Sequence, residues 1–256
     1  MLARPVARPR PHALEALFRK RRVVIGVIHA RPLPGAPDYD GAPIEELYAA
    51  ALEDGLRYAE GGLDGLIVEN HGDIPFLKPD AIGPETAAAM AVMADRVRRE
   101  VGLPVGINVL ANGALTTLAV AKAAGAGFIR VNQWANAYVA NEGIVEGLAA
   151  AATRYRAWLR GRELKIFADV HVKHGAHAIV ADRSLSELTR DVEFFDADVV
   201  IATGQGTGDA AANVGDILSV ADGVIVASSL KRDGVWWHEV EPDWVAAFMA
   251  EVRRLA

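Results

Sequence analysis

The segment KIFADVHVKHG, residues 165–175, places several ionisable side chains at the end of an apolar run. Asp169, His171 and Lys173 alternate with valines, and alternate residues of a β-strand point to the same face. A carboxylate, an imidazole and an amine on one face are groups that general acid–base catalysis uses. If Phe167 forms the floor of an enclosed sheet, these three polar side chains stack toward its open end.

Polar residues end the other apolar runs in the same way. They are His29 in the first run, Glu69, Asn70 and Asp73 in and after the second, Asn108 in the third, Arg130 and Asn132 in the fourth, and Thr203 in the sixth. In a parallel barrel the C-terminal strand ends meet at one rim, which supplies the catalytic groups. One polar residue there can simply bind a loop, but polar residues after every run predict a shared site. A buried Arg130 needs an anion, which Glu69 or an anionic ligand would supply.

Three kinds of chemistry are open to these groups. The first is acid–base catalysis, with Asp169 or Glu69 as the base, His171 as the acid and Lys173 stabilising an enolate or oxyanion. A Schiff base on Lys173 ranks lower, because neighbouring carboxylates would keep the amine protonated. The third is a divalent metal ion, for which Glu69, Asp73, Asp169 and His171 are acceptable ligands, although their spacing is weak support. We favour acid–base chemistry on a small anionic molecule.

Short β-branched runs alternate with Ala- and Leu-rich stretches of helical period, which predicts parallel strands joined by helices. The expected strands are residues 23–30, 65–70, 104–108, 128–134, the first part of 165–175, 198–204 and 223–229. The expected helices are residues 43–62, 84–102, 113–126, 142–161, 184–195 and 242–256, with a short helix within 208–222.

This alternation predicts an α/β fold, a parallel (β/α) barrel of the TIM type. A dinucleotide-binding sheet is disfavoured because no GxGxxG sequence opens the first unit. Seven strands are recognisable rather than eight, because a single βα unit fits between Val200 and Ile225. Such a barrel either closes with distortion or leaves an open seam between its sixth and seventh strands. Because a partner chain would cover the exposed edges of a seam, we expect a homodimer.

Composition excludes several function classes. The chain has 256 residues, enough for one α/β domain with a large core, and a formal net charge of −6. It has no basic stripe for a nucleic acid and no cysteine for disulfides, thiolate catalysis or metal ligation. No window reaches the roughly 18 apolar residues of a membrane span, so a membrane role would be peripheral. We expect a cytoplasmic protein with an N-terminal arm and short helix in residues 1–20 and one barrel domain in 21–256.

Several motifs resemble the BtpA family, which includes the SgcQ-like proteins. They are GVIHARPLPGAP, EGGLDGLIVENHGDIPF, PVGINVLAN, FIRVNQW, KIFADVHVKHGA and DGVIVASSLKRDGVWW, in the same order over about residues 23–250. The resemblance implies a phosphate-binding barrel related to ribulose-phosphate and tryptophan-pathway enzymes. The cyanobacterial namesake of the family is associated with photosystem I accumulation at thylakoid membranes, and other members accompany sugar-metabolism genes. No established reaction comes with the family.

The resemblance also implies a phosphate site, because such barrels bind phosphate with the loops after strands seven and eight. Family members continue from a motif like ATGQGTG through a further helix and strand, and this βα unit is missing here near residues 209–214. We expect the two remaining loops to meet, since glycines let a chain approach an anion closely. The phosphate-binding residues would be Gly204, Gly206, Thr207, Ser228, Ser229 and Lys231.

Two functions from different classes follow. The first is a lyase, isomerase or hydrolase that acts on a phosphorylated or anionic sugar-like metabolite. Asp169, His171, Lys173 and Glu69 would be catalytic, and His29, Asn70, Asp73, Asn108, Arg130, Asn132 and Thr203 would bind the substrate. The second is a non-catalytic barrel that assists the biogenesis or stability of a membrane complex of the photosystem type. The polar strand face favours the first function, whereas the missing unit and the biogenesis role of the family namesake favour the second.

Overall fold

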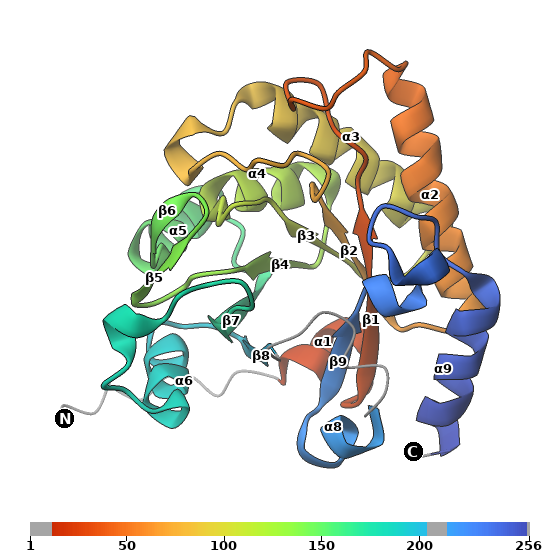
Figure 1. Ribbon diagram of the computed structural model, residues 1–256. Helices are drawn as coiled ribbons and strands as arrows, with labels where there is room; N and C mark the ends of the chain where they lie inside the picture. Colours follow the sequence, from red (N-terminus) through yellow and green to blue (C-terminus); the bar gives the residue numbers. More distant parts are fainter. Residues whose placement is uncertain (1–11, 204–213, 255–256) are drawn as a thin grey trace.

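A sheet of seven parallel strands curls around the centre of the molecule, and helices cover its outer face (Figure 1). The computed structural model describes residues 12–203 and 214–254. The strands are β1 (Val23–His29), β2 (Gly65–Glu69), β3 (Val105–Asn108), β4 (Phe128–Val131), β7 (Lys165–His171), β8 (Val199–Ala202) and β9 (Gly223–Val226). Their order in the sheet is β8-β7-β4-β3-β2-β1-β9. The seven strands and the TIM-type architecture expected from the sequence are confirmed.

The strands β8 and β9 are the two edges of this sheet. The first pairs with β7, where Phe167 lies opposite Val199, and the second pairs with β1, where Val23 lies opposite Gly223. Within the described residues β8 and β9 do not pair with each other, so the sheet has an open seam between the sixth and seventh strands. The place of the missing βα unit, near residues 209–214, lies almost entirely outside the described residues.

Helices alternate with the strands as the sequence predicts. They are α1 (Ala13–Phe18), α2 (Ile44–Gly61), α3 (Pro84–Val101), α4 (Ala114–Ala124), α5 (Ala149–Trp158), α6 (Leu185–Phe194), α8 (Val214–Val220) and α9 (Pro242–Arg254). Short 3-10 turns occur at Pro79–Ala81, Ala178–Val180, Ser228–Leu230 and Arg232–Gly234. The helix α2 ends at Gly62, whose φ of 94° is a left-handed conformation that glycine adopts without strain.

The region after β4 differs from the expectation. Residues 142–161 were expected to form one helix, but the helix α5 covers only Ala149–Trp158. The strands β5 (Ala137–Ala140) and β6 (Gly143–Glu146) form an antiparallel hairpin before it. Tyr138 and Val145 of this hairpin are buried against Val172, and this packing outweighs the local helical pattern.

The interior of the curled sheet is filled by side chains from its strands and from α1. Leu14 and Phe18 of that helix form one buried cluster with Phe128 and Phe167. The rings of Phe128 and Phe167 stack with centroids 4.5 Å apart, and Phe18 meets Phe128 at 5.9 Å. Gly65 makes room for α1, because a Cβ there would lie 2.5 Å from a carbon of the Phe18 ring. Phe167 therefore lies in the interior floor where the sequence placed it.

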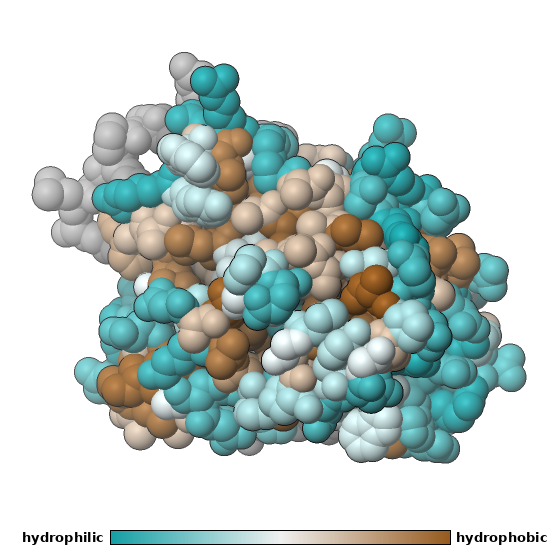
Figure 2. Space-filling model, turned by 90° about the horizontal axis from the view of Figure 1, so that it is seen from above, coloured by the Kyte–Doolittle hydropathy of each residue, from teal (hydrophilic) through white to brown (hydrophobic). Residues whose placement is uncertain are grey.

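Polar and apolar residues mix on the surface. Figure 2 shows mostly hydrophilic residues on one face, with smaller hydrophobic areas between them. Trp158 and Trp237 are the most exposed tryptophans, at 75% and 65%. In the described part of the chain, every helix is too short or too polar to cross a membrane.

Candidate functional site

The C-terminal ends of neighbouring strands bring the polar residues of the sequence motifs together. His29 at the end of β1 lies opposite Glu69 at the end of β2, and Glu69 lies opposite Asn108 at the end of β3. Arg130 on β4 lies opposite Phe167 on β7, two residues before Asp169. These strands are adjacent and parallel (Figure 1), so the residues at their C-terminal ends lie at one end of the curled sheet.

Arg130 lies between two buried carboxylates. Its Nε and Nη2 donate hydrogen bonds to Asp169 Oδ2 and Oδ1 at 3.1 and 3.2 Å, and its Nη1 lies 3.9 Å from Glu69 Oε2. Burial opposes the charge of the guanidinium, but the charges of Asp169 and Glu69 raise the pKa of Arg130 above its ordinary value. Asp169 and Glu69 thus both supply the negative charge that the buried Arg130 requires.

Asp169 accepts hydrogen bonds from residues in or directly after the two strands that flank β7, which are β4 and β8. Besides Arg130, its donors are Asn132 Nδ2 at 3.3 Å and Thr203 Oγ1 at 3.2 Å. Burial raises the pKa of Asp169, while Arg130 and Thr203 oppose this shift. These donors occupy both carboxylate oxygens and fix their position.

Glu69 is held by residues of β1, β3 and its own following loop. Asn108 Nδ2 donates to Glu69 Oε2 at 2.6 Å, while His71 Nδ1 lies 3.1 Å and His29 Nε2 lies 3.7 Å from Glu69 Oε1. Burial favours the neutral carboxyl, but the hydrogen bond from His71 and the charges around the site hold the pKa of Glu69 below its usual range. Glu69 is therefore the common partner of two histidines and an amide.

His29 is oriented by a backbone carbonyl. Its Nδ1 lies 3.0 Å from the carbonyl oxygen of Trp236, and a carbonyl only accepts, so Nδ1 carries the hydrogen. Burial lowers the pKa of His29 to about 3 and keeps the ring neutral. The His29 and His71 rings stack at 4.5 Å, and Trp236 meets the His71 ring edge to face at 4.5 Å. These contacts fix both imidazoles beside Glu69.

The other two residues of the expected polar strand face, His171 and Lys173, do not lie together. A β-bulge between Asp169 and His171 interrupts the alternation of β7. His171 stacks on His177 with centroids 3.6 Å apart, and burial followed by the charge of His177 lowers the pKa of His171. Lys173 is exposed at the rim, where the surrounding protein and Arg130 lower its pKa more than the two carboxylates raise it. Lys173 thus remains electrostatically coupled to Asp169, whereas His171 contacts His177.

Asn70 and Asp73 stabilise the loops at the rim. Asn70 Oδ1 accepts a hydrogen bond from the backbone N–H of Leu110 at 2.7 Å, and its Nδ2 donates to Asp73 Oδ2 at 3.0 Å. Asp73 Oδ1 accepts from the backbone N–H of Leu33 at 2.9 Å. These bonds tie the loops after β1, β2 and β3 together, so both side chains already have partners within the protein.

The expected phosphate-binding residues fall into three groups. Gly204, Gly206 and Thr207 lie outside the described residues. Ser228 and Ser229 open a 3-10 turn directly after β9, and Ser228 is buried.

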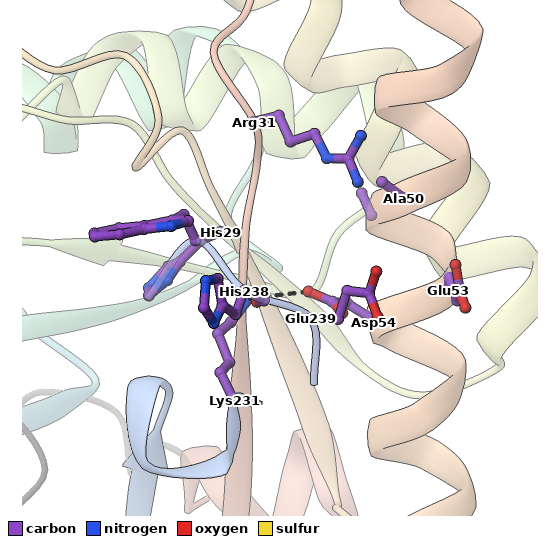
Figure 3. A pocket seen from close by; sticks show the side chains of 10 residues that line it. His29, Arg31, Ala50, Glu53, Asp54, Lys231, His238 and Glu239 are labelled. Carbon is purple, nitrogen blue, oxygen red and sulfur yellow. Dashed lines mark hydrogen bonds and ion pairs between the residues drawn. The ribbon is translucent and has the colours of Figure 1, made fainter. Parts of the chain in front are cut away.

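Lys231, the cationic member of that set, is bound elsewhere. It is 1% exposed, and its Nζ donates to Asp54 Oδ2 of α2 at 2.9 Å and to the carbonyl oxygen of His238 at 3.1 Å. Figure 3 shows the pocket that Lys231 and Asp54 line together with His29. We leave Lys231 out of the proposed ligand site, because its ammonium group joins the last loop to α2.

Two features of the site were not expected from the sequence. His71 was not among the expected site residues, although it follows Glu69 by two positions in the segment VENHGD. The buried atoms Asn108 Oδ1 and Asn132 Oδ1 have no hydrogen-bond partner within the described residues. Rotating the Asn108 amide would only place its oxygen against Glu69 Oε2, so this acceptor stays unpaired within the protein.

Comparison with protein families agrees with the motifs. The model of the BtpA family matches residues 20–212 and 205–254. This chain belongs to the BtpA family. The two matched stretches overlap at residues 205–212, which include part of the place, near residues 209–214, where a βα unit was expected to be missing.

Relatives in the BtpA family come from distant organisms. An uncharacterized protein of Archaeoglobus fulgidus is 40% identical over 84% of this chain and 93% of its own length. The photosystem I biogenesis protein BtpA of Synechocystis is 36% identical over 91% of this chain and 88% of its own length. An uncharacterized mitochondrial protein of Caenorhabditis elegans is 33% identical over 93% of this chain and 96% of its own length.

Solved structures share the fold of this BtpA-family chain. N-(5'-phosphoribosyl)anthranilate isomerase from Pyrococcus furiosus superposes with a TM-score of 0.54 at 13% identity, over 91% of this chain and 99% of that enzyme. Dihydropteroate synthase of Xanthomonas albilineans with 4-aminobenzoic acid gives a TM-score of 0.50 at 19% identity, over 93% of this chain and 84% of that enzyme. At these identities the likeness extends to the fold alone.

Proposed function

We propose that this chain is an acid–base enzyme that acts on a small phosphorylated or anionic sugar-like metabolite at the C-terminal rim of its barrel. The observation that carries this proposal is Arg130 held between Glu69 and Asp169 inside the mouth. A buried ion network costs desolvation energy and stabilises a fold no better than apolar packing does. Strongly shifted pKa values at the mouth of an enclosed site favour a functional role for such a network.

The surrounding groups suit a ligand that combines negative charge with hydroxyl groups. Arg130 and Lys173 supply positive charge, and the unpaired oxygens of Asn108 and Asn132 are acceptors for ligand hydroxyls. Because hydrogen bonds already occupy both oxygens of Asp169, we assign it the positioning of Arg130 and give Lys173 the proton transfer. A lowered pKa suits Lys173 to this role, since proton transfer is most efficient when the pKa approaches the working pH.

The phosphate part of the proposal rests on the BtpA family and its fold. In barrels of this type phosphate binds at the loops after the last strands, which here are residues 204–208 and the turn that begins at Ser228. Ser228 and Ser229 would donate hydrogen bonds there together with Gly204, Gly206 and Thr207. The isomerase with the same fold acts, by its name, on a phosphoribosyl compound, which agrees with this assignment.

A thermal-shift screen with sugar phosphates and inorganic phosphate tests the proposal. We expect at least one sugar phosphate to raise the Tm of the wild type, and both Arg130→Lys and Asp169→Asn to abolish the shift. Arg156→Lys is the matched control, because Arg156 also pairs with an aspartate, Asp198, at the opposite ends of the strands. A rise in Tm that is equal in the wild type and all three variants would contradict the proposal, and so would the absence of any rise with every compound.

The relative from Synechocystis supports a second candidate function, since its name assigns it to photosystem I biogenesis. In this alternative the chain is a non-catalytic barrel that assists a membrane complex from the cytoplasmic side. Co-sedimentation with thylakoid-like anionic vesicles would then be equal for the wild type and for Asp169→Asn. Vesicle binding of this kind, together with a negative ligand screen, would favour assembly over catalysis.

We also propose that the chain forms a homodimer. The argument is the pair of strand edges at β8 and β9, which a second copy would cover. Size-exclusion chromatography with light scattering would give twice the monomer mass of 27.3 kDa, whereas a monomer at all concentrations would contradict this assignment.

A further inference from the structure

We propose that His29, Glu69 and His71 bind one divalent transition-metal ion at the mouth of the barrel. Each residue offers one ligand atom, and these three atoms lie within 4.8 Å of one another. The three residues come from the ends of β1 and β2 and from the loop that follows β2. Of the metal ligands expected from the sequence, Glu69 alone belongs to this group.

The orientation of His29 is the first argument for an ion. Its Nδ1–H donates to the carbonyl of Trp236, which leaves Nε2 as the acceptor nitrogen of the ring. This nitrogen lies 3.7 Å from Oε1 of the ionised Glu69, and none of the described residues donates a hydrogen bond to it. Two acceptors that face each other are stabilised by a cation between them.

The distances around Glu69 Oε1 are the second argument. His71 Nδ1 lies 3.1 Å and His29 Nε2 lies 3.7 Å from this oxygen. A tetrahedral ion with bonds of about 2.1 Å has ligand atoms about 3.4 Å apart, a value between the two observed distances. Side-chain movements that draw together the three atoms, now within 4.8 Å of one another, would bring them into coordination, with the Nδ1 proton of His71 passing to its Nε2 or to solvent.

The residues around the three ligands are the third argument. Metal-bound histidines commonly donate their other N–H to a backbone carbonyl, as His29 does to Trp236. Ligating carboxylates are themselves hydrogen-bonded, and Asn108 holds Glu69 Oε2 at 2.6 Å while Oε1 faces the histidines. Both contacts orient the ligands before an ion arrives.

The donor set selects the class of ion. Two imidazole nitrogens and one carboxylate oxygen suit Zn²⁺, Co²⁺ or Fe²⁺ better than Mg²⁺ or Ca²⁺, which prefer oxygen ligands. Three protein ligands leave one position open, the arrangement of catalytic zinc sites. An ion there would lie on the side of Glu69 away from Arg130 and could polarise a ligand oxygen. This last role rests on the proposed function, whereas metal binding itself does not.

Metal binding is measured on the untagged full-length chain without any organic ligand. The protein is stripped with a chelator and titrated with Co²⁺, whose bound form absorbs visible light. It is then loaded with Zn²⁺ and dialysed, and its metal content is determined by mass spectrometry. We expect about one ion per chain in the wild type and at least about tenfold weaker binding in His71→Ala and His29→Asn.

His171→Ala is the matched control, because His171 is a histidine of the same rim that lies outside the group. It should bind the metal like the wild type, and circular dichroism shows whether each variant is folded. His71 is partly exposed, so its replacement tests the site even if His29→Asn fails to fold. A wild type that binds no Co²⁺ or Zn²⁺, or binding retained in His71→Ala, overturns the inference. A positive sugar-phosphate screen beside a negative metal titration would leave the proposed function standing and remove the metal site alone.

Discussion

Arg130 holds both oxygens of the Asp169 carboxylate, at 3.1 and 3.2 Å, across neighbouring strands in the mouth of the barrel. Arg130→Met removes the cation and leaves Asp169 buried without its counter-charge. We expect the free energy of unfolding to fall by about 3–5 kcal/mol in urea denaturation. Arg130→Met combined with Asp169→Leu removes both charges and should recover much of this loss. A double variant as unstable as the sum of the two single variants would contradict the coupling.

Lys231 is expected to contribute to stability rather than to ligand binding. Lys231→Met leaves Asp54 buried without its counter-charge, so we expect the free energy of unfolding to drop by about 3 kcal/mol. Arg232→Ala is the matched control, since the neighbouring Arg232 pairs with Glu239 at the exposed surface and should cost less than about 1 kcal/mol. If Lys231→Met instead keeps its stability and loses the thermal shift with sugar phosphates, Lys231 belongs to the ligand site.

His171 makes the protein less stable in acid. Burial and the charge of His177 lower its pKa in the folded chain, whereas the unfolded chain takes up this proton near pH 6.5. Below pH 6.5 the unfolded state binds more protons, so the free energy of unfolding decreases until the lowered pKa is passed. We expect urea denaturation at pH 7, 6 and 5 to show a smaller decrease in His171→Asn. The difference should stay below about 1.4 kcal/mol per pH unit, the limit for one proton, and an unchanged pH dependence would refute this reading.

Phe18 tests the contribution of α1 to the interior. Phe18→Ala would leave a cavity against Phe128, and we expect it to lower the free energy of unfolding by about 3–5 kcal/mol. Phe195→Ala is the matched control, because the Phe195 side chain is 44% exposed and its removal should cost much less. Equal losses in the two variants would mean that α1 is not part of the core.

The fold follows from the sequence where the pattern is local. Seven β-branched runs separated by helical stretches were sufficient to predict the strands, and alternation placed Phe167 in the interior. The hairpin at residues 137–146 was missed because its second strand also fits the start of a helix at residue 142. Its stability comes from the contact of Tyr138 and Val145 with Val172, and such a tertiary contact leaves no periodic signal.

The candidate site was predictable only in part. Strand ends correctly brought Glu69, Asn108, Arg130 and Asp169 together, because parallel strands end at one rim. The pairing of Lys231 with Asp54 joins residues 177 positions apart, which spacing along the chain does not reveal. His171 left the expected face because a bulge interrupts β7, and the sequence gives no sign of that bulge.

The position of α1 has a consequence for synthesis of the chain. This helix is made before β4 and β7, which carry the aromatic residues Phe128 and Phe167 of the same cluster. The apolar side of α1 therefore stays exposed or loosely bound until these two strands have left the ribosome. A fusion partner that keeps the N-terminus away from the nascent strands would delay the packing of α1. The C-terminal rim of the barrel would then form before α1 has filled the interior.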